Sequence, residues 1–445
     1  MRIVIAGAGD IGYHLATALV DAGHSLNLID SNEDILQVVA NNIDALTLLG
    51  DASSVDVLNR ADVVRSDIYI ATTTSESTNL LSCILAKKIG AKKTIARISN
   101  NEYLHENQRR NFLEVGIDNL FSPTLLAAQE IERLINRCSA TDIFEFEEGK
   151  LSIVGYTVEN NSPYIGKTFD SLCRDGEYQA KTIALLRNGK TSIPKFTDKI
   201  DAADHVYLVS NAKKLSELDQ DLGEELKVIK HIMLIGDTEI AFQTARLLEQ
   251  NYALTVVIEN ENKSKKFYEK LEKALVVAGD PSNLQLLKEE GLERMDAFIA
   301  LTVNSETNII SSLTADQMGV FRSIALVDNA AYTHLSQKIG VDTLINKKLI
   351  AANNIFRYVR KGQVEAIASL HGVEAEIIEY VVHSNSYITQ RTIGEIGMPK
   401  DALIVGVVRR DKGIIPNNDF MLEIEDKVIV LTLPKSTSKV EDIFK

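Results

Sequence analysis

The stretch Arg2-Ile-Val-Ile-Ala-Gly-Ala-Gly-Asp-Ile-Gly12 decides the fold, because it joins a short apolar run directly to a glycine-rich turn that opens a helix. In such a context Gly7 permits a tight turn, Gly9 lets a pyrophosphate approach backbone N–H groups, and Gly12 lets the helix pack closely on the sheet. Ala8, Asp10 and Ile11 complete the loop. The motif therefore predicts a dinucleotide-binding site near the N-terminus.

An acidic residue follows this motif at the expected distance. Asp30 ends the next apolar run, 18 residues after the last glycine (30 − 12 = 18). A carboxylate there accepts hydrogen bonds from an adenosine ribose and repels a 2′-phosphate, which favours NAD(H) over NADP(H). The alternative is a glycine turn and a surface acid with no ligand, and the sequence leaves it open.

Further candidate site residues follow the later apolar runs. They are Asp51-Ala52 after the third run, Thr72-Thr73 after the fourth, and Arg97 at the end of the fifth. Because doubly wound folds bind ligands at the carboxyl ends of their strands, we expect Asp51 to bond the adenine or its loop and Arg97 to neutralise phosphate. The alternatives are an N-cap of the helix near Ser54 for Asp51 and a solvated surface charge for Arg97.

The chain repeats itself. Arg2-Ile-Val-Ile-Ala-Gly7 returns as His231-Ile-Met-Leu-Ile-Gly236, a lag of 229 residues (236 − 7 = 229), and the same lag relates Gly50-Asp51 to Gly279-Asp280. Beyond residue 105 the lag shortens to 224, because Gly116 aligns with Gly340 (340 − 116 = 224). A duplication of this length predicts two copies of one structural unit.

The second copy carries a degenerate motif. Thr238 replaces Gly9, Ala241 replaces Gly12 and Leu326 replaces Arg97. These changes add a Cβ where backbone must meet phosphate and remove a cation, so we expect weaker or different binding there, of an adenine nucleotide or of nothing. The candidate residues of this weaker second site are Gly236, Asp237, Thr238, Glu239, Ile240, Glu259 and Asp280.

The pattern of apolar runs indicates an α/β fold. Short runs alternate with stretches of helical period, which is typical of βαβ units and a parallel sheet. We therefore expect two Rossmann-like, doubly wound parallel sheets, each followed by a small α+β domain. The expected domains are residues 1–138 and 227–362 for the Rossmann-like copies, and 139–226 and 363–445 for the small ones. A helix should begin at Pro123, with Ser122 as its N-cap, and pack on another domain or subunit or on its own domain.

Composition excludes several function classes. The formal net charge of −14 disfavours both nucleic acid and direct lipid binding. The N-terminus lacks a signal-peptide pattern, and no apolar run approaches the roughly 20 residues needed to span a bilayer. Three separated cysteines, Cys83, Cys138 and Cys173, fit a reducing cytoplasm and buried packing. No Cys or His spacing supports a metal site.

Taken together, the duplication, the glycine motif, Asp30, the Gly-Asp-Ala segment at residues 50–52 and the Thr-rich loop before Asn79 resemble the TrkA family of Trk-system potassium-uptake regulatory proteins. The resemblance covers the whole chain and implies two tandem RCK (regulator of potassium conductance) units. It further implies a non-enzymatic regulator with an NAD(H)-binding first domain, responsive to ATP or ADP. Such a protein assembles as a homotetramer and docks on a TrkH- or TrkG-like membrane potassium-transport subunit. It would be a cytoplasmic protein, peripheral on the inner face of the plasma membrane through that partner.

Two other function classes stay open. An NAD-dependent dehydrogenase would need an acid or base positioned beside the nicotinamide, and no persuasive His/Asp or Tyr/Lys pair follows the motif. His105 and His334 match between the copies, and we expect them to serve packing. A redox-sensing transcription regulator would need a recognition helix and a basic surface, which the charge of −14 disfavours.

Overall fold

The computed structural model describes residues 1–136, 142–147, 149–158, 162, 164–169, 180–187, 190–195, 197–202, 204–210, 229–329, 332, 341–359, 364–369, 375–383 and 387–444. The chain forms two compact units. Unit 1 comprises Met1–Gln129 and Asn346–Val359, and unit 2 comprises Glu130–Ile345 and Arg360–Lys445. The expected domain boundaries at 138/139, 226/227 and 362/363 lie outside the described residues.

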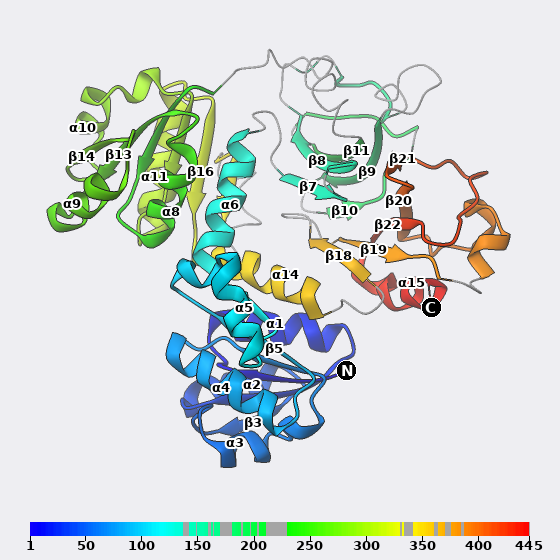
Figure 1. Ribbon diagram of the computed structural model, residues 1–445. Coiled ribbons are helices and arrows are strands. Elements are labelled where there is room, and N and C mark those ends of the chain that lie inside the picture. The colour runs from blue at the N-terminus through cyan, green and yellow to red at the C-terminus, as the bar shows by residue number, and fades with distance from the viewer. Residues whose placement is uncertain are drawn as a thin grey trace. The chain divides into compact units, whose positions relative to one another are not determined.

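Unit 1 is built on a six-stranded parallel sheet with the order β3-β2-β1-β4-β5-β6. In Figure 1 the residues of this sheet are coloured blue to cyan. The chain starts in the middle, winds outward to β3, returns to β4 and winds outward again. The point where the direction reverses therefore lies between β1 and β4. The elements are β1 (Arg2–Ala6), α1 (Asp10–Asp21), β2 (Ser25–Asp30), α2 (Glu33–Asn42), β3 (Leu46–Leu49), α3 (Val55–Arg60), β4 (Ile68–Ala71), α4 (Glu76–Ile89), β5 (Lys93–Arg97), α5 (Glu106–Glu114), β6 (Asn119–Phe121) and α6 (Pro123–Asn136).

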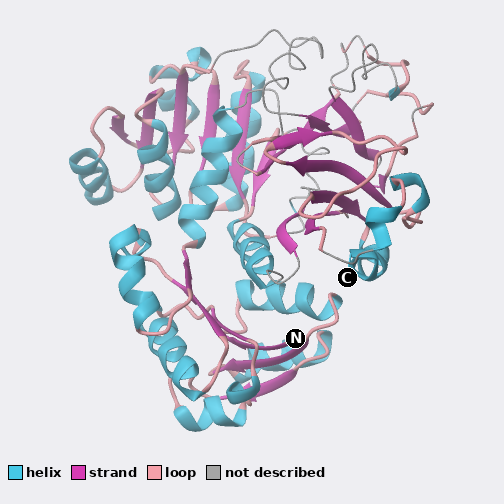
Figure 2. Ribbon diagram, turned by 45° about the vertical axis from the view of Figure 1, so that its right-hand side comes forward, coloured by secondary structure: helices cyan, strands magenta, loops and turns pink. Residues whose placement is uncertain are grey.

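Unit 2 contains a second parallel sheet with the same winding, β14-β13-β12-β15-β16-β17. Figure 2 shows helices beside the strands of both parallel sheets, which explains why β4 and its counterpart β15 are buried at every position. The fold class expected from the sequence is confirmed. The elements are β12 (His231–Ile235), α8 (Glu239–Leu248), β13 (Ala253–Ile258), α9 (Glu261–Lys270), β14 (Leu275–Ala278), α10 (Leu284–Glu289), β15 (Ala297–Ala300), α11 (Ser305–Gln317), β16 (Arg322–Leu326), β17 (Thr343–Ile345) and α14 (Lys347–Val359).

Two small antiparallel sheets complete unit 2, with the orders β10-β9-β11-β8-β7 and β18-β19-β22-β20-β21. Their apolar faces share one core, in which Ile153 and Tyr207 of the first sheet cluster with Ile377 and Ile429 of the second. The elements are β7 (Asp142–Phe146), β8 (Leu151–Thr157), β9 (Ala180–Arg187), β10 (Lys190–Ser192), β11 (His205–Ser210), β18 (Val364–Ser369), β19 (Glu376–Val381), β20 (Ala402–Arg409), β21 (Lys412–Ile414), β22 (Lys427–Thr432) and α15 (Thr437–Phe444).

Each small sheet carries the same ion pair between a partly exposed arginine and a buried aspartate. Arg187 donates from Nε and Nη2 to the two carboxylate oxygens of Asp204 (2.7 and 2.6 Å), and Arg409 does the same to Asp426 (2.9 and 2.7 Å). Both aspartate side chains are only 1% exposed, and these hydrogen bonds raise the pKa of each arginine. The duplication therefore extends to the interior contacts of the small sheets.

Two helices that follow the last parallel strands connect the halves of the sequence. α6 begins at Pro123, and the amide of Leu125 donates to Ser122 Oγ (3.3 Å), which confirms the expected helix start. Residues 130–136 of α6 belong to unit 2, where Tyr252 donates its hydroxyl to Asn136 Oδ1 (2.6 Å). α14 follows β17 of the second sheet but belongs to unit 1, where it packs against α1.

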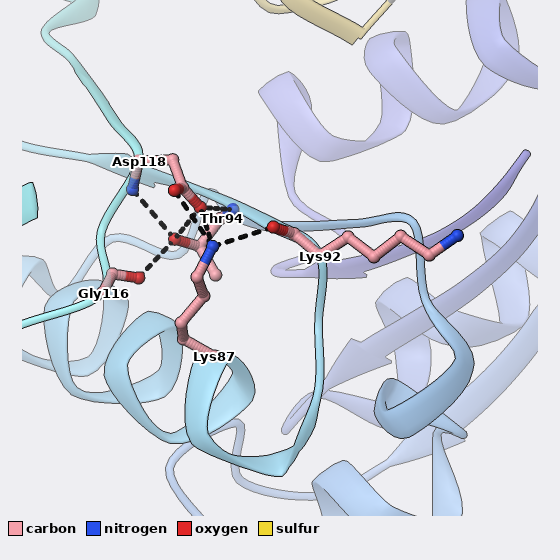
Figure 3. A network of polar contacts seen from close by, with 5 residues as sticks. All are labelled: Lys87, Lys92, Thr94, Gly116 and Asp118. Atoms are coloured by element: carbon pink, nitrogen blue, oxygen red, sulfur yellow. Dashed lines mark hydrogen bonds and ion pairs between the residues drawn. The ribbon is translucent and has the colours of Figure 1, made fainter.

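A polar network fixes the edge of the first sheet (Figure 3). The Asp118 carboxylate accepts from Lys87 Nζ (2.8 Å) and from the amide of Thr94 (2.7 Å), and Thr94 Oγ1 donates to Gly116 O (2.7 Å). These contacts tie α4 and the turn before β6 to β5. They therefore hold β5 in the register that brings Arg97 to the carboxyl edge of the sheet.

Of the cysteines and histidines expected to be packed in the interior, the structure confirms one and contradicts another. Cys83 is fully buried and donates from Sγ to Ile95 O (3.4 Å), while burial raises the pKa of its thiol, so its expected packing role is confirmed. His105 is exposed, so the packing role expected of it is wrong. Cys138, Cys173 and His334 lie outside the described residues. Across the described ranges, every helix is too short or too polar to cross a bilayer, and three or more His, Cys, Asp or Glu side chains nowhere gather as a metal-binding group.

Candidate nucleotide site

The glycine motif forms the loop between β1 and α1, at the reversal point of the sheet. Gly7 has φ +96°, and a Cβ there would lie 2.7 Å from the Thr73 amide nitrogen. A Cβ on Gly12 would lie 1.9 Å from Gly7 O, whereas one on Gly9 would meet no atom within 4 Å. Gly7 and Gly12 are therefore required by the close packing of the loop itself. Gly9 instead faces open space, as expected where a ligand approaches the backbone.

The N-terminus of α1 has no side-chain cap. Gly9 is the N-cap residue and has no side chain, so the first amides of the helix are left without the hydroxyl or carboxylate that usually accepts from them. Such amides, with the positive end of the helix dipole, attract a phosphate. Ala8 and Ile11 are buried, which limits them to backbone contacts with a ligand, while Asp10 is exposed.

Asp30 supports the loop from β2. Its Oδ2 accepts from the amide of Ala8 (2.7 Å) and its Oδ1 accepts from the amide of Asn32 (2.9 Å). A carboxylate has about four lone-pair positions, so these bonds leave acceptor capacity for ribose hydroxyls. Asp30 therefore both orients the glycine loop and presents a negative charge beside it.

Thr72 and Thr73 connect the glycine loop to the end of β4. Thr72 is buried and donates from Oγ1 to Gly7 O (2.9 Å). Thr73 donates from its amide and from Oγ1 to Asn79 Oδ1 (2.9 and 2.6 Å), and Asn79 Nδ2 donates to Arg97 O (3.0 Å). In the sequence, Asn79 is marked only by the Thr-rich loop that precedes it. Its role is to bind together the two loops and the end of β5.

Arg97 lies at the same edge as a half-buried cation. Its Nη1 donates to Thr72 O at 3.3 Å, and burial lowers the pKa of its guanidinium. No carboxylate among the described residues pairs with it. This environment differs from the solvated surface charge that was the alternative, and it suits a cation whose counter-ion is a ligand phosphate.

Asp51 and Ala52 lie after β3. Asp51 Oδ1 accepts from the amide and the hydroxyl of Ser53 (2.8 Å each), and these hydrogen bonds lower the pKa of the Asp51 carboxyl. Ser54, not Asp51, is the N-cap residue of α3, so the alternative of a helix cap is wrong. Asp51 shapes the turn before α3, and the small side chain of Ala52 is buried in the core of the first sheet.

The second loop, between β12 and α8, keeps the backbone turn of the first loop but has a side-chain cap on its helix. Gly236 has φ +126°, as Gly7 has a positive φ. Thr238, in the place of Gly9, accepts from the amide of Ala241 (3.2 Å) and donates to Leu301 O (2.8 Å). The threonine hydroxyl therefore occupies the helix N-terminus that stays uncapped in the first loop. Ile240 is buried, as Ile11 is.

Charges in the second loop also differ. Asp237, in the place of Ala8, pairs with Lys263 Nζ at 3.0 Å, and Glu239 accepts from Gln243 Nε2 (2.8 Å). Glu259 is exposed and, in the part of the chain that the structure describes, accepts from no loop amide as Asp30 does. Asp280 repeats the turn of Asp51, since its Oδ1 accepts from Ser282 N (2.8 Å).

The residues of the first loop fit a dinucleotide. A pyrophosphate and a ribose require open backbone, free amides, a cation and a carboxylate. The first loop supplies open space at Gly9, uncapped amides on α1, the fixed carboxylate of Asp30, and Arg97, which pairs with no carboxylate within the described ranges. In the second loop the Thr238 hydroxyl accepts from a helix amide at the position of Gly9, an Asp237–Lys263 ion pair stands at the position of Ala8, and Leu326 replaces the cation.

Solved structures share this architecture. The crystal structure of the GsuK RCK domain matches with a TM-score of 0.63 and 18% identity, over 100% of this chain and 94% of that one. The GsuK channel bound to NAD matches with a TM-score of 0.62 and 17% identity, over 100% of this chain and 78% of that one. At these identities the likeness shows the fold alone. Fold and loops define a protein of two tandem Rossmann-like units, each with a glycine loop between its first strand and first helix.

The family follows from the sequence comparisons. The TrkA-N domain model matches residues 3–123 and 232–347, and the TrkA-C domain model matches residues 377–445. TrkA homolog 2 of Methanosarcina mazei is 32% identical over 455 residues, covering 100% of both chains. TrkA of Vibrio alginolyticus is 31% identical over 452 residues, covering 100% of this chain and 99% of that one. The chain therefore belongs to the TrkA family of Trk system potassium uptake proteins.

Proposed function

We propose that this chain is the cytoplasmic regulatory subunit of a potassium uptake system, and that it binds NAD(H) in the first glycine loop as a signal. The observation that carries the proposal is the uncapped N-terminus of α1 behind Gly9, with Asp30 fixed beside it. The relatives named as Trk system potassium uptake proteins and the NAD-bound GsuK channel support it.

The carboxylate of Asp30 favours NAD(H) over NADP(H), because a 2′-phosphate would add charge beside it. ATP and ADP are proposed as further ligands of the same loop, since they share the adenosine and the phosphates that these groups contact. Ala8, Asp10, Ile11, Asp51, Ala52, Thr72 and Thr73 shape the loop, and Arg97 faces the phosphates. The second loop is proposed to bind weakly or not at all.

The mechanism contains no chemical step. A nucleotide that contacts one conformation of the protein better than another shifts the population toward that conformation. In a homotetramer docked on a TrkH- or TrkG-like membrane subunit, at the inner face of the plasma membrane, this shift would open or close the transport pathway. The proposal requires two conformations with different nucleotide contacts and no consumption of the cofactor.

The test is NADH binding to the full-length protein, followed by fluorescence or calorimetry, with Gly9→Thr as the variant. A threonine there copies the second loop and would cap α1 with its own hydroxyl, while the open space around Gly9 lets the variant fold. We expect wild type to bind NADH and Gly9→Thr to bind at least about tenfold more weakly, the equivalent of losing one charge-assisted contact.

Function is tested by potassium flux through the reconstituted membrane subunit. With the regulatory protein bound, flux should respond to NADH, ATP or ADP, and Gly9→Thr should abolish the response to NADH. Flux indifferent to all three nucleotides would overturn the regulatory role. Steady oxidation of NADH on a keto acid would replace it with a dehydrogenase.

A further inference from the structure

We propose that Lys348, which the second half of the sequence supplies, is a positioning residue for the phosphates of a nucleotide in the first glycine loop. The inference rests on the proposed function, because it presupposes a ligand with phosphates at residues 7–12. It adds a cation that no motif in the first copy predicts, and it names a route by which that ligand acts on the rest of the chain.

The position of Lys348 is set by its ion pair and its burial. Its Nζ lies 2.8 Å from Oδ2 of Asp10, the first residue of α1 and the one that follows Gly9. The lysine side chain is 16% exposed, against 69% for Asp10. The ammonium is therefore held at the loop by its surroundings, while the carboxylate remains open to solvent and to a ligand.

The backbone of α14 fixes where this side chain starts. Asn346 Oδ1 accepts from the amides of Lys348 (3.0 Å) and Leu349 (3.1 Å), which caps the first turn of the helix. α14 then packs against α1 within unit 1. A capped and packed helix places Lys348 with little freedom, as a positioning role requires.

The charges explain why a cation is needed at this place. Asp10 puts a negative charge on the first turn of α1, where a pyrophosphate would add two more. Lys348 offsets the carboxylate and, within the reach of a lysine side chain, can also pair with a phosphate. Arg97 of β5 supplies the second cation at the same loop. Attraction between these groups is stronger at a partly buried edge than in water.

The second copy supplies a lysine to the first loop, but the first copy supplies none to the second loop within the described ranges. The residue aligned with Lys348 is Thr124 (348 − 224 = 124), whose hydroxyl bonds to Ser122 Oγ (2.9 Å). The residue aligned with Asp10 is Glu239, and its lysine neighbour is Lys266 (3.9 Å), from the same copy. Of the two loops in the described ranges, only the first receives a cation from the other copy.

A consequence follows by linkage. If a bound phosphate pairs with Lys348, nucleotide binding stabilises the packing of α14 against α1. Any change that stabilises this packing then raises nucleotide affinity by the same factor. α14 continues directly from β17 of the second sheet. Occupancy of the first loop is thereby transmitted to the second half of the chain.

The experiment compares Lys348→Met with Lys347→Met in the full-length protein. Lys347 is the neighbouring lysine of α14, so both variants lose one positive charge and keep a side chain of similar length. Affinities are measured for NADH, ADP and adenosine, which lacks phosphate. We expect Lys348→Met to weaken NADH and ADP about fivefold, as for a partly exposed ion pair, and to leave adenosine unchanged. Lys347→Met should stay within about twofold of wild type for all three ligands.

Asp10→Asn and the double variant Asp10→Asn/Lys348→Met separate positioning from plain folding stability. In Lys348→Met the charge of Asp10 is no longer offset and repels the phosphates. Removing that carboxylate as well should restore part of the affinity, so that the double variant binds ADP more tightly than Lys348→Met alone. Equal effects of Lys348→Met and Lys347→Met, or an equal loss for adenosine and ADP, would overturn the inference. Wild-type protein that binds neither NADH nor ADP would instead overturn the proposed function, and the inference with it.

Discussion

The two glycine loops follow equivalent strands, β1 and β12, and precede equivalent helices, α1 and α8, yet the amides at the two helix N-termini are treated in opposite ways. In the first, Gly9 leaves the amides of α1 uncapped. In the second, the hydroxyl of Thr238 accepts from Ala241 N and donates to Leu301 O, so the protein supplies its own acceptor. The loop proposed to bind nucleotide is therefore the one whose helix lacks a side-chain cap, and the missing cap costs some stability.

The two copies also differ in charge at the amino ends of their parallel strands. Lys87 pairs with Asp118 at 2.8 Å in the first copy, whereas the aligned residues of the second copy are Asp316 and Asp342. Burial, and then the charge of Asp342, raise the pKa of the Asp316 carboxyl. The second copy thus keeps the bond from Ser323 N to Asp342 (2.7 Å), which matches Thr94 to Asp118, without the lysine. Backbone geometry is retained while charge has diverged.

The largest effect is expected from Gly12→Ala, which places in the first loop the residue found at position 241. Its Cβ would lie 1.9 Å from Gly7 O, so the loop must open. We expect NADH affinity to fall at least about a hundredfold and the free energy of unfolding to fall by about 1–3 kcal/mol, as in other overpacked sites. Calorimetric titration and urea unfolding measure the two changes.

Ala241→Gly is the matched control for Gly12→Ala. It should lower stability by about 1 kcal/mol through helix propensity and should not create a site, because Thr238 still caps α8. If Gly12→Ala bound NADH like wild type, the close packing of the first loop would not be what distinguishes the copies.

An intermediate effect is expected from Arg97→Leu, which copies Leu326. The variant should weaken NADH and ADP about tenfold, as loss of a charge-assisted contact does, and should leave adenosine little changed. Because the cation is half-buried without a carboxylate partner among the described residues, stability should stay the same or rise. Titration with the three ligands and thermal unfolding test both parts.

Leu326→Arg is the reciprocal change in the second copy. It should not confer binding, since Asp237 with Lys263 and the hydroxyl of Thr238 still occupy that loop. A loss for adenosine as large as that for ADP in Arg97→Leu would show that the arginine supports the sheet edge and does not contact phosphate.

The first strand, the glycine loop and the place of Asp30 were predictable from the sequence, for a physical reason. Glycines at fixed spacing and apolar runs of strand length report local backbone geometry, so β1, the loop and the position of Asp30 could be predicted. Two contacts could not be predicted: the hydrogen bond from the Ala8 amide to Asp30, and the ion pair of Lys348 with Asp10. Their partners are 22 and 338 residues apart (30 − 8 = 22; 348 − 10 = 338) and leave no periodic signal in the sequence. The shared core of the small sheets escaped prediction for the same reason.

The smallest effect is expected from His14→Gln, which copies Gln243 of the second copy. Burial, partly offset by Asp10 and reinforced by Lys348, lowers the pKa of His14 below its ordinary 6.5. The unfolded chain therefore takes up this proton first as pH falls. The contribution of His14 to stability is complete above about pH 6.5 and is lost as pH falls toward the lowered value. Gln243, which donates to Glu239 Oε1 at 2.8 Å, has no such proton to gain.

His14→Gln should accordingly flatten the fall in melting temperature between pH 7.5 and 5.5 by about one or two degrees, and it should leave NADH affinity at pH 7.5 unchanged. His105→Gln, at an exposed histidine of the same unit, is the control and should leave the slope as in wild type. A slope unchanged in His14→Gln would mean that the acid sensitivity of unit 1 arises elsewhere. The first loop would then differ from the second in its glycines and its cations, but not in its response to protons.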